Sequence, residues 1–153
     1  QARYRLWTNS RAQVTNYGAS ASGRYELTRG YFAGANATLA RLDHRANPDG
    51  LEDGFNTPQW SCNVSLANER ALGRLGFGVN YRWQSRFYWQ SFLVNGDVPA
   101  YGTLDAQLTY AVPHPDLRIK LGATNLTNRY YRSFLGGPAI GGFYYLTLTG
   151  HVR

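Results

Sequence analysis

Apolar and polar residues alternate along most of the chain with a period of two. The clearest case is RLGFGVNYRW, Arg74 to Trp83, where every second position is apolar or aromatic and glycine, asparagine or arginine lie between. Successive side chains of a β-strand point to opposite faces, so this pattern predicts strands. It predicts about eight of them in a continuous meander. They lie near 3–8, 17–27, 31–39, 60–66, 75–83, 103–110, 117–124 and 144–149.

The connections between these strands alternate in length. Short links are expected at 28–30, 68–73 and 112–116, and long links at 43–58, 85–100 and 128–142. Barrels of the bacterial outer membrane have short periplasmic turns and long outer loops, whereas a sandwich does not require such alternation. The sequence therefore predicts an all-β fold, an antiparallel transmembrane β-barrel meander in the outer membrane, with its C-terminus in the periplasm. The alternative is a soluble β-sandwich or lipocalin-like barrel.

A membrane explains why each strand has one apolar and one polar face. Hydrocarbon cannot satisfy backbone N–H and C=O groups, so strands cross it only in a closed barrel, with apolar side chains against lipid. The residues expected to face lipid are Leu75, Phe77, Val79, Tyr81, Trp83, Leu104, Leu108, Ile119, Leu121, Leu146 and Leu148. In the first long strand pair, 17–27 and 31–39, this face is mostly alanine, which gains little free energy on transfer to lipid. This strand pair is therefore either less suited to lipid or in contact with another protein surface.

Composition supports strands and narrows the chemistry. Aromatic residues make up 15% of the chain, there are 17 glycines and no methionine, and a single cysteine, Cys62, excludes an internal disulfide. The net charge of +7 comes from dispersed arginines and one lysine, Lys120, which disfavours nucleic acid as a partner. The three histidines are far apart in sequence and no catalytic motif is present, so we expect no enzyme activity and no cofactor.

Ligand recognition is expected in the long loops. Aromatic and amide groups at Trp89, Gln90 and Tyr101 could stack on sugars or aromatic ligands, although loop packing explains them equally well. A second group of residues could contact an anionic substrate or lipopolysaccharide phosphates, with loop packing as the alternative: Arg129, Tyr130, Tyr131 and Arg132. The acidic loop residues are a weak calcium candidate, and a solvated acidic turn is favoured over it: Asp43, Asp49, Glu52 and Asp53.

The end of the chain resembles the C-terminal barrel region of a TonB-dependent outer-membrane transporter. The segment LGATNLTNRYYRSFLGGPAIGGFYYLTLTG is similar to the family's Gly-x-x-Asn-Leu-x-Asn-x-x-Tyr pattern followed by a glycine-rich loop and a final strand. The matching positions are Gly122, Asn125, Leu126, Asn128 and Tyr131. YGASASGRYEL and NTPQWSCNVSLANE also resemble its last strands, particularly in Bacteroidota-like members.

The resemblance implies that residues 1–153 are the C-terminal portion of a larger, roughly 22-stranded barrel whose plug domain and N-terminal strands are absent from this chain. It implies active uptake of a scarce nutrient, namely a ferric siderophore, cobalamin or an oligosaccharide. The implied partners are outer-membrane lipid and lipopolysaccharide, the remaining barrel strands and the plug, and TonB through the missing N-terminal part. Two alternatives stay open: a small structural or adhesive eight-stranded barrel, and a secreted β-sandwich binding module.

Overall fold

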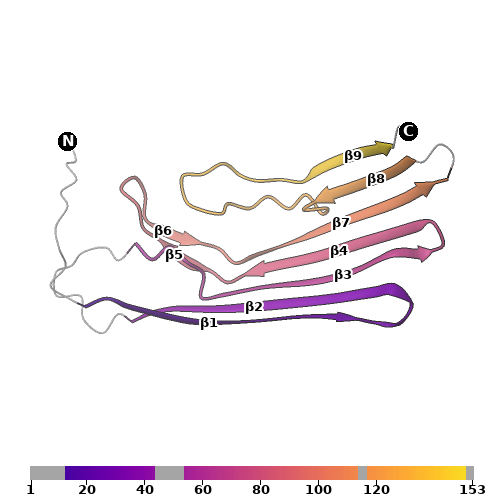
Figure 1. The fold of residues 1–153 in the computed structure, drawn as a ribbon. Coiled ribbons are helices and arrows are strands. Elements are labelled where there is room, and N and C mark those ends of the chain that lie inside the picture. The colour runs from indigo at the N-terminus through magenta and orange to yellow at the C-terminus, as the bar shows by residue number, and fades with distance from the viewer. Residues whose placement is uncertain (1–12, 44–53, 114–116, 151–153) are drawn as a thin grey trace.

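The computed structural model describes residues 13–43, 54–113 and 117–150, and within them seven strands form a large open antiparallel sheet (Figure 1). Its strands are β1 (Thr15–Glu26), β2 (Tyr31–Asp43), β3 (Trp60–Leu72), β4 (Leu75–Gln84), β7 (Tyr101–Val112), β8 (Leu117–Thr124) and β9 (Phe143–Gly150). Each of these strands pairs with the next one in this order, with β1 and β9 at the two edges. The predicted antiparallel meander is confirmed, while the strand expected near 3–8 lies outside the described residues.

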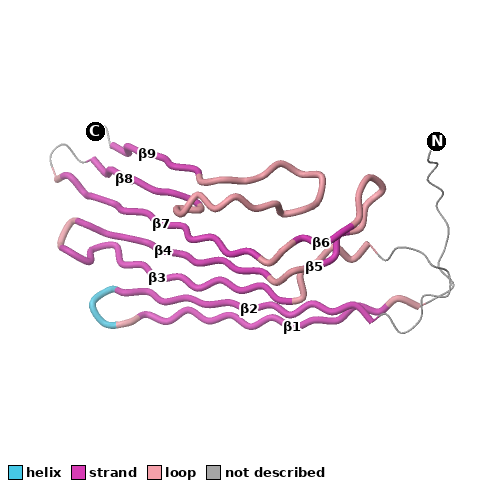
Figure 2. The backbone as a smooth tube through the Cα atoms, turned by 180° about the vertical axis from the view of Figure 1, so that it is seen from behind, coloured by secondary structure: helices cyan, strands magenta, loops and turns pink. Residues whose placement is uncertain are grey.

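A short hairpin interrupts the connection between β4 and β7. It consists of β5 (Phe87–Trp89) and β6 (Gly96–Val98), which pair with each other and not with the large sheet. Figure 2 shows it at the same end of the sheet as the long connection between β8 and β9. The sequence predicted only a long loop here, because three-residue strands are too short for a period of two to be recognised.

The opposite end of the sheet carries the short turns. β1 and β2 are joined by the 3-10 turn Thr28–Gly30, in which Arg29 has a φ of 61°. β3 continues to Leu72, farther than predicted, and its pairing with β4 shifts register between Asn68 and Leu72, as in a β-bulge. The buried Asn68 side chain donates to the Arg29 carbonyl (3.0 Å) and accepts from the Arg70 N–H (2.8 Å), so it ties the bulge to the neighbouring turn.

Strand register places the alternating residues on two separate faces. Phe77 pairs with Leu108, Leu108 with Leu121, and Leu121 with Leu146, which makes one apolar row across four strands. The next row has Gly78 opposite Gln107 and belongs to the other face. We call these the apolar face and the polar face. All the residues predicted to face lipid share the apolar face.

Little of the apolar face is covered by protein. In the described part of the chain the buried hydrophobic residues are Phe87, Val98 and Ala123, whereas the Leu108, Leu121 and Leu148 side chains are 50%, 56% and 62% exposed. A β-sandwich would bury them under a second sheet, and the described residues provide none there, which contradicts the sandwich alternative.

No helix among the described residues is long and apolar enough to span a membrane.

Candidate ligand-binding site at the loop end

Two long connections pack together at the loop end of the sheet, the end where β4 finishes and β7 begins. In the hairpin, the buried Phe87 pairs with the buried Val98. The Trp89 ring lies 5.4 Å from the Phe134 ring, which belongs to the connection between β8 and β9. Trp89 therefore belongs to a small apolar core between the loops, as the packing alternative expected, and within the described residues its indole N–H is buried without a hydrogen-bond partner.

Two of the predicted candidates, Tyr101 and Tyr131, meet although they are far apart in sequence. Their rings stack with centroids 4.2 Å apart and planes inclined by 25°. Tyr101 begins β7, and Tyr131 is held by two backbone hydrogen bonds with Ile140, of 3.2 and 2.8 Å. The paired rings form a flat aromatic surface at the loop end of the polar face.

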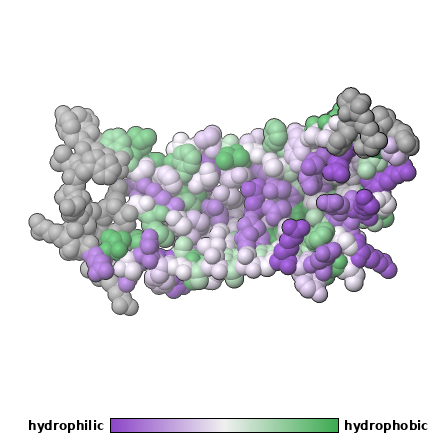
Figure 3. Space-filling view, viewed as in Figure 1, coloured by the Kyte–Doolittle hydropathy of each residue, from purple (hydrophilic) through white to green (hydrophobic). Residues whose placement is uncertain are grey.

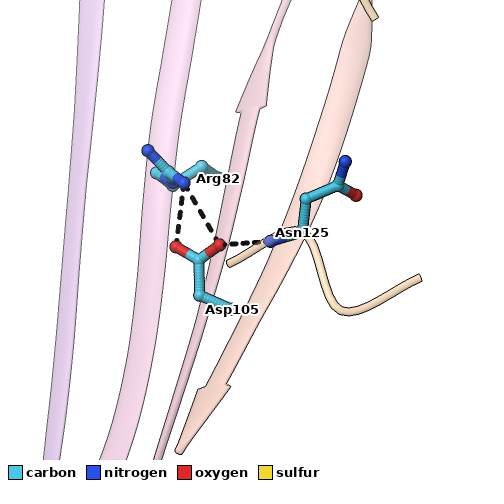
Figure 4. Close-up of polar contacts among 3 residues, drawn as sticks. All are labelled: Arg82, Asp105 and Asn125. Atoms are coloured by element: carbon cyan, nitrogen blue, oxygen red, sulfur yellow. Dashed lines mark hydrogen bonds and ion pairs between the residues drawn. The ribbon is translucent and has the colours of Figure 1, made fainter. Parts of the chain in front are cut away.

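An ion pair below this stack fixes the start of the loop that carries Tyr131. Arg82 on β4 lies 2.9 Å from the Asp105 carboxylate on β7, and the same carboxylate accepts a 2.9 Å hydrogen bond from the Asn125 backbone N–H (Figure 4). The buried Asn125 side chain in turn donates to the Arg129 carbonyl and accepts from the Arg129 N–H, at 2.9 and 3.2 Å. Asp105 thus connects two strands to the loop base.

The Asn-Leu-x-Asn motif closes this loop. Asn125 and Asn128 both have φ of 50°, a left-handed conformation that asparagine tolerates better than most residues. The Asn128 N–H donates to the Asn125 carbonyl, and the Asn128 side chain accepts from the Gly142 N–H at 2.7 Å, which joins the two ends of the loop. The motif therefore has a structural role in setting the loop base.

Gln90 also has a supporting role, because it holds the connection between β2 and β3. Its backbone N–H and C=O bond the Asn56 side chain at 2.6 and 2.8 Å, and its side-chain oxygen accepts from the Gly54 N–H. An open cavity of about 470 Å³ lies beside this contact. Its lining includes Arg41, Phe55, Gln59, Arg86, Tyr88 and Gln90.

The remaining candidates are solvent-exposed or outside the described residues. Arg129, Tyr130 and Arg132 are exposed, with the Tyr130 side chain 69% accessible, and could reach a ligand above the loops. Asp49, Glu52 and Asp53 lie outside the described residues, so the calcium hypothesis stays a prediction. Within the described ranges, no three histidine, cysteine, aspartate or glutamate side chains group as a metal site would need.

Sequence reasoning did not identify Arg82 and Asp105 as site residues. Both belong to strands whose alternation marks them only as part of the polar face. Arg82 pairs opposite Thr103, and Asp105 opposite Asn80, so the two charges are diagonal neighbours once the register is known. Opposite charges on adjacent strands were the only available signal.

A family model agrees with this architecture. The model described as TonB dependent receptor-like, beta-barrel, matches residues 2–126. No curated protein matches the chain in sequence.

Solved structures show the same fold. The siderophore receptor PiuA from Acinetobacter baumannii matches with a TM-score of 0.65 and 17% identity, over 86% of this chain and 22% of that one. The FrpB iron transporter from Neisseria meningitidis gives 0.66 and 19%, over 88% and 23%. The ferric yersiniabactin uptake receptor FyuA from Yersinia pestis gives 0.64 and 16%, over 88% and 22%. The chain spans less than a quarter of the length of each, and a particular likeness to Bacteroidota members stays a prediction.

Proposed function

Because the chain belongs to the TonB-dependent receptor-like β-barrel family, we propose that it forms part of the barrel wall and outer loops of an outer-membrane transporter for TonB-dependent nutrient uptake. The observation that carries the proposal is the uncovered apolar face. Exposed leucines such as Leu108, Leu121 and Leu148 would be unfavourable in water and favourable against hydrocarbon. In this proposal the residues of the apolar face, from Leu75 on β4 to Leu148 on β9, contact lipid.

The orientation follows from the two ends of the sheet. Long connections lie outside the cell and short turns in the periplasm, as in other outer-membrane barrels. The last described residue, Gly150, pairs with Leu117 at the short-turn end, which supports a periplasmic C-terminus in this proposal.

The partners follow from what the described sheet leaves unpaired. Within the described residues β1 and β9 each have one edge without a strand, and hydrocarbon does not tolerate such edges. The remaining barrel strands would pair with them, and a plug would contact the polar face. TonB would act through a part of the protein outside this chain, and the exposed Arg129 and Arg132 would meet lipopolysaccharide phosphates.

For the substrate we favour a ferric siderophore over cobalamin or an oligosaccharide. The support is the likeness to a siderophore receptor, an iron transporter and a ferric yersiniabactin receptor. Tyr130 and the stack of Tyr101 on Tyr131 would contact the ligand directly, whereas Trp89 and Gln90 would hold the loops in place. The chemistry required is binding, with no bond made or broken.

The test is nutrient uptake by cells that lack the protein, compared with cells carrying it. We expect the protein to restore uptake of at least one ferric siderophore, and to do so only with TonB present. Uptake of cobalamin and of oligosaccharides is measured in parallel. Recovery of the protein in the soluble fraction without detergent would contradict the membrane assignment, and uptake unaffected by loss of TonB would contradict the mechanism.

A further inference from the structure

We propose that the polar face carries, at the short-turn end, a binding site for a small polyanion with two or more carboxylate or phosphate groups. The site is a cavity of about 490 Å³, a size typical of small-molecule sites. Its polar lining includes Arg70, Arg74, Arg118, Lys120, Gln107 and Thr109. Glu69 is the one carboxylate in the lining, so four cations face a single negative charge.

The ion pairs found in the described part of the chain lie away from this cavity. Arg82 and Arg86 each have an aspartate partner, at 2.9 and 3.6 Å. By contrast, among residues 13–43, 54–113 and 117–150, none of the four cavity cations forms an ion pair. Figure 3 shows hydrophilic side chains gathered at this end of the molecule. Four cations that line one cavity with a single carboxylate favour an anion between them.

The strand pairing places a small residue between two of the cations. The Arg74 carbonyl accepts from the Ala111 N–H at 3.0 Å, and Ala111 pairs on its other side with Arg118. Arg74 and Arg118 therefore flank Ala111 from the two neighbouring strands, with their backbones about 10 Å apart across the sheet. Because alanine fills little of this width, the two guanidinium groups border an open space.

The adjacent row repeats the arrangement one step farther along the strands. Gly76 pairs with Thr109, and Thr109 with Lys120. The Thr109 hydroxyl supplies a neutral donor beside the Lys120 ammonium. Two rows thus provide three cations and a hydroxyl around one hollow.

The β-bulge brings the fourth cation to the rim. A Cβ added to Gly76 would lie 2.7 Å from the Glu69 carbonyl carbon and 2.9 Å from the Asn68 oxygen, so the bulged backbone passes directly over this glycine. The buried Asn68 fixes that backbone through Arg70 and Arg29. The backbone of Arg70 is therefore held in place by the β-bulge and by its hydrogen bond to Asn68.

The donor set selects the ligand class. Guanidinium groups bind carboxylate or phosphate through paired hydrogen bonds, and a lysine adds a point charge. Three arginines and one lysine exceed what one monoanion can neutralise, so a ligand such as pyrophosphate or citrate fits better than acetate. This proposal rests on the cavity alone and does not require that the protein transport anything.

The test is calorimetric titration of the full-length protein in detergent with pyrophosphate, citrate and acetate. We expect saturable binding of pyrophosphate or citrate that is tighter than that of acetate and weakens as salt is raised. Arg118→Gln should weaken it about tenfold or more, because a hydrogen bond to a charged group is lost. Ala111→Leu keeps all four cations but puts a larger side chain into the cavity between Arg74 and Arg118, so it should also weaken binding.

The matched control is Arg24→Gln, which removes the same charge from the polar face at β1, where the guanidinium lies over the Phe32 ring and outside the cavity. It should bind like the unmodified protein. Absence of saturable binding, as when another part of the protein fills the cavity, would overturn the proposal. Binding that Arg118→Gln and Ala111→Leu leave unchanged would also overturn it, since it would mark an adventitious ion only.

Discussion

The two faces of the sheet are built from the same strands but are suited to different surroundings. On the apolar face large side chains such as Leu108 and Leu121 are exposed, and the described residues form no second layer over them. On the polar face small residues alternate with charged or amide groups that bond one another, as Arg82 and Asp105 do, and as Asn63 does with Asn36 at 2.9 Å. Among the residues that the structure describes, the large sheet therefore has no conventional core, and its stability depends on what covers each face.

A charge should have very different effects on the two faces, and this is the largest expected effect. Val79→Arg puts a cation on the apolar face near the middle of β4, and should destabilise the protein in lipid vesicles by about 2–4 kcal/mol. Asn80→Arg is the control, because residue 80 lies on the polar face opposite Asp105 and should change little. Urea unfolding of both variants in vesicles measures the difference, and equal losses would contradict the distinction between the faces.

A bulky side chain on the polar face should be harmful where an aromatic ring covers a glycine. The Tyr145 ring lies directly over Gly122, and the Cβ of a larger residue would collide with that ring. Gly122→Val should cost about 1–3 kcal/mol through overpacking. Gly78→Val, also on the polar face, is the control, since a Cβ added at Gly78 meets only the flexible Gln107 side chain, at 3.2 Å. Similar costs at both positions would show that the ring does not constrain this site.

Loss of the Asp105 carboxylate should loosen the loop between β8 and β9. Asp105→Asn removes the partner of Arg82 and weakens the acceptor for the Asn125 N–H, with an expected cost of about 1 kcal/mol. Hydrogen exchange near Asn125 should become faster. The control Asp97→Asn breaks only the exposed contact with Arg86 at 3.6 Å and should leave stability nearly unchanged. If Asp97→Asn speeds exchange near Asn125 as much, the network has no special role.

The smallest expected effect compares two parts of the apolar face. In β1 and β2 this face is rich in alanine, and Ala35 pairs with Gly23 and Val64, whereas in β7 to β9 it is rich in leucine. Against lipid, Ala35→Leu should stabilise the protein by up to about 1 kcal/mol through added apolar burial. Against another protein surface, the same change should destabilise it by about 1–3 kcal/mol through overpacking. Unfolding in vesicles decides which surface Ala35 contacts.

The sequence was sufficient for the strands of the large sheet and their faces because a period of two is a local signal. It also placed the long and short connections at opposite ends, and it identified Tyr101 and Tyr131 as candidates. It could not pair Arg82 with Asp105, or separate Arg74 from Arg118 by Ala111, because both arrangements depend on register between strands. The β-bulge after Asn68 and the three-residue strands of the β5–β6 hairpin have no periodic signal and were missed.

The central claim is that lipid covers the apolar face, and spin-label accessibility in bilayer vesicles tests it most directly. Labels at Val79 and Leu108 are compared with labels at Asn80 and Gln107, in a background where Cys62, which shares the apolar face, is replaced by alanine. We predict that labels at Val79 and Leu108 collide readily with oxygen and rarely with a water-soluble nickel chelate. Labels at Asn80 and Gln107 should not show this preference for oxygen. Shielding of Val79 and Leu108 from both reagents, or ready access by the nickel chelate, would contradict the account.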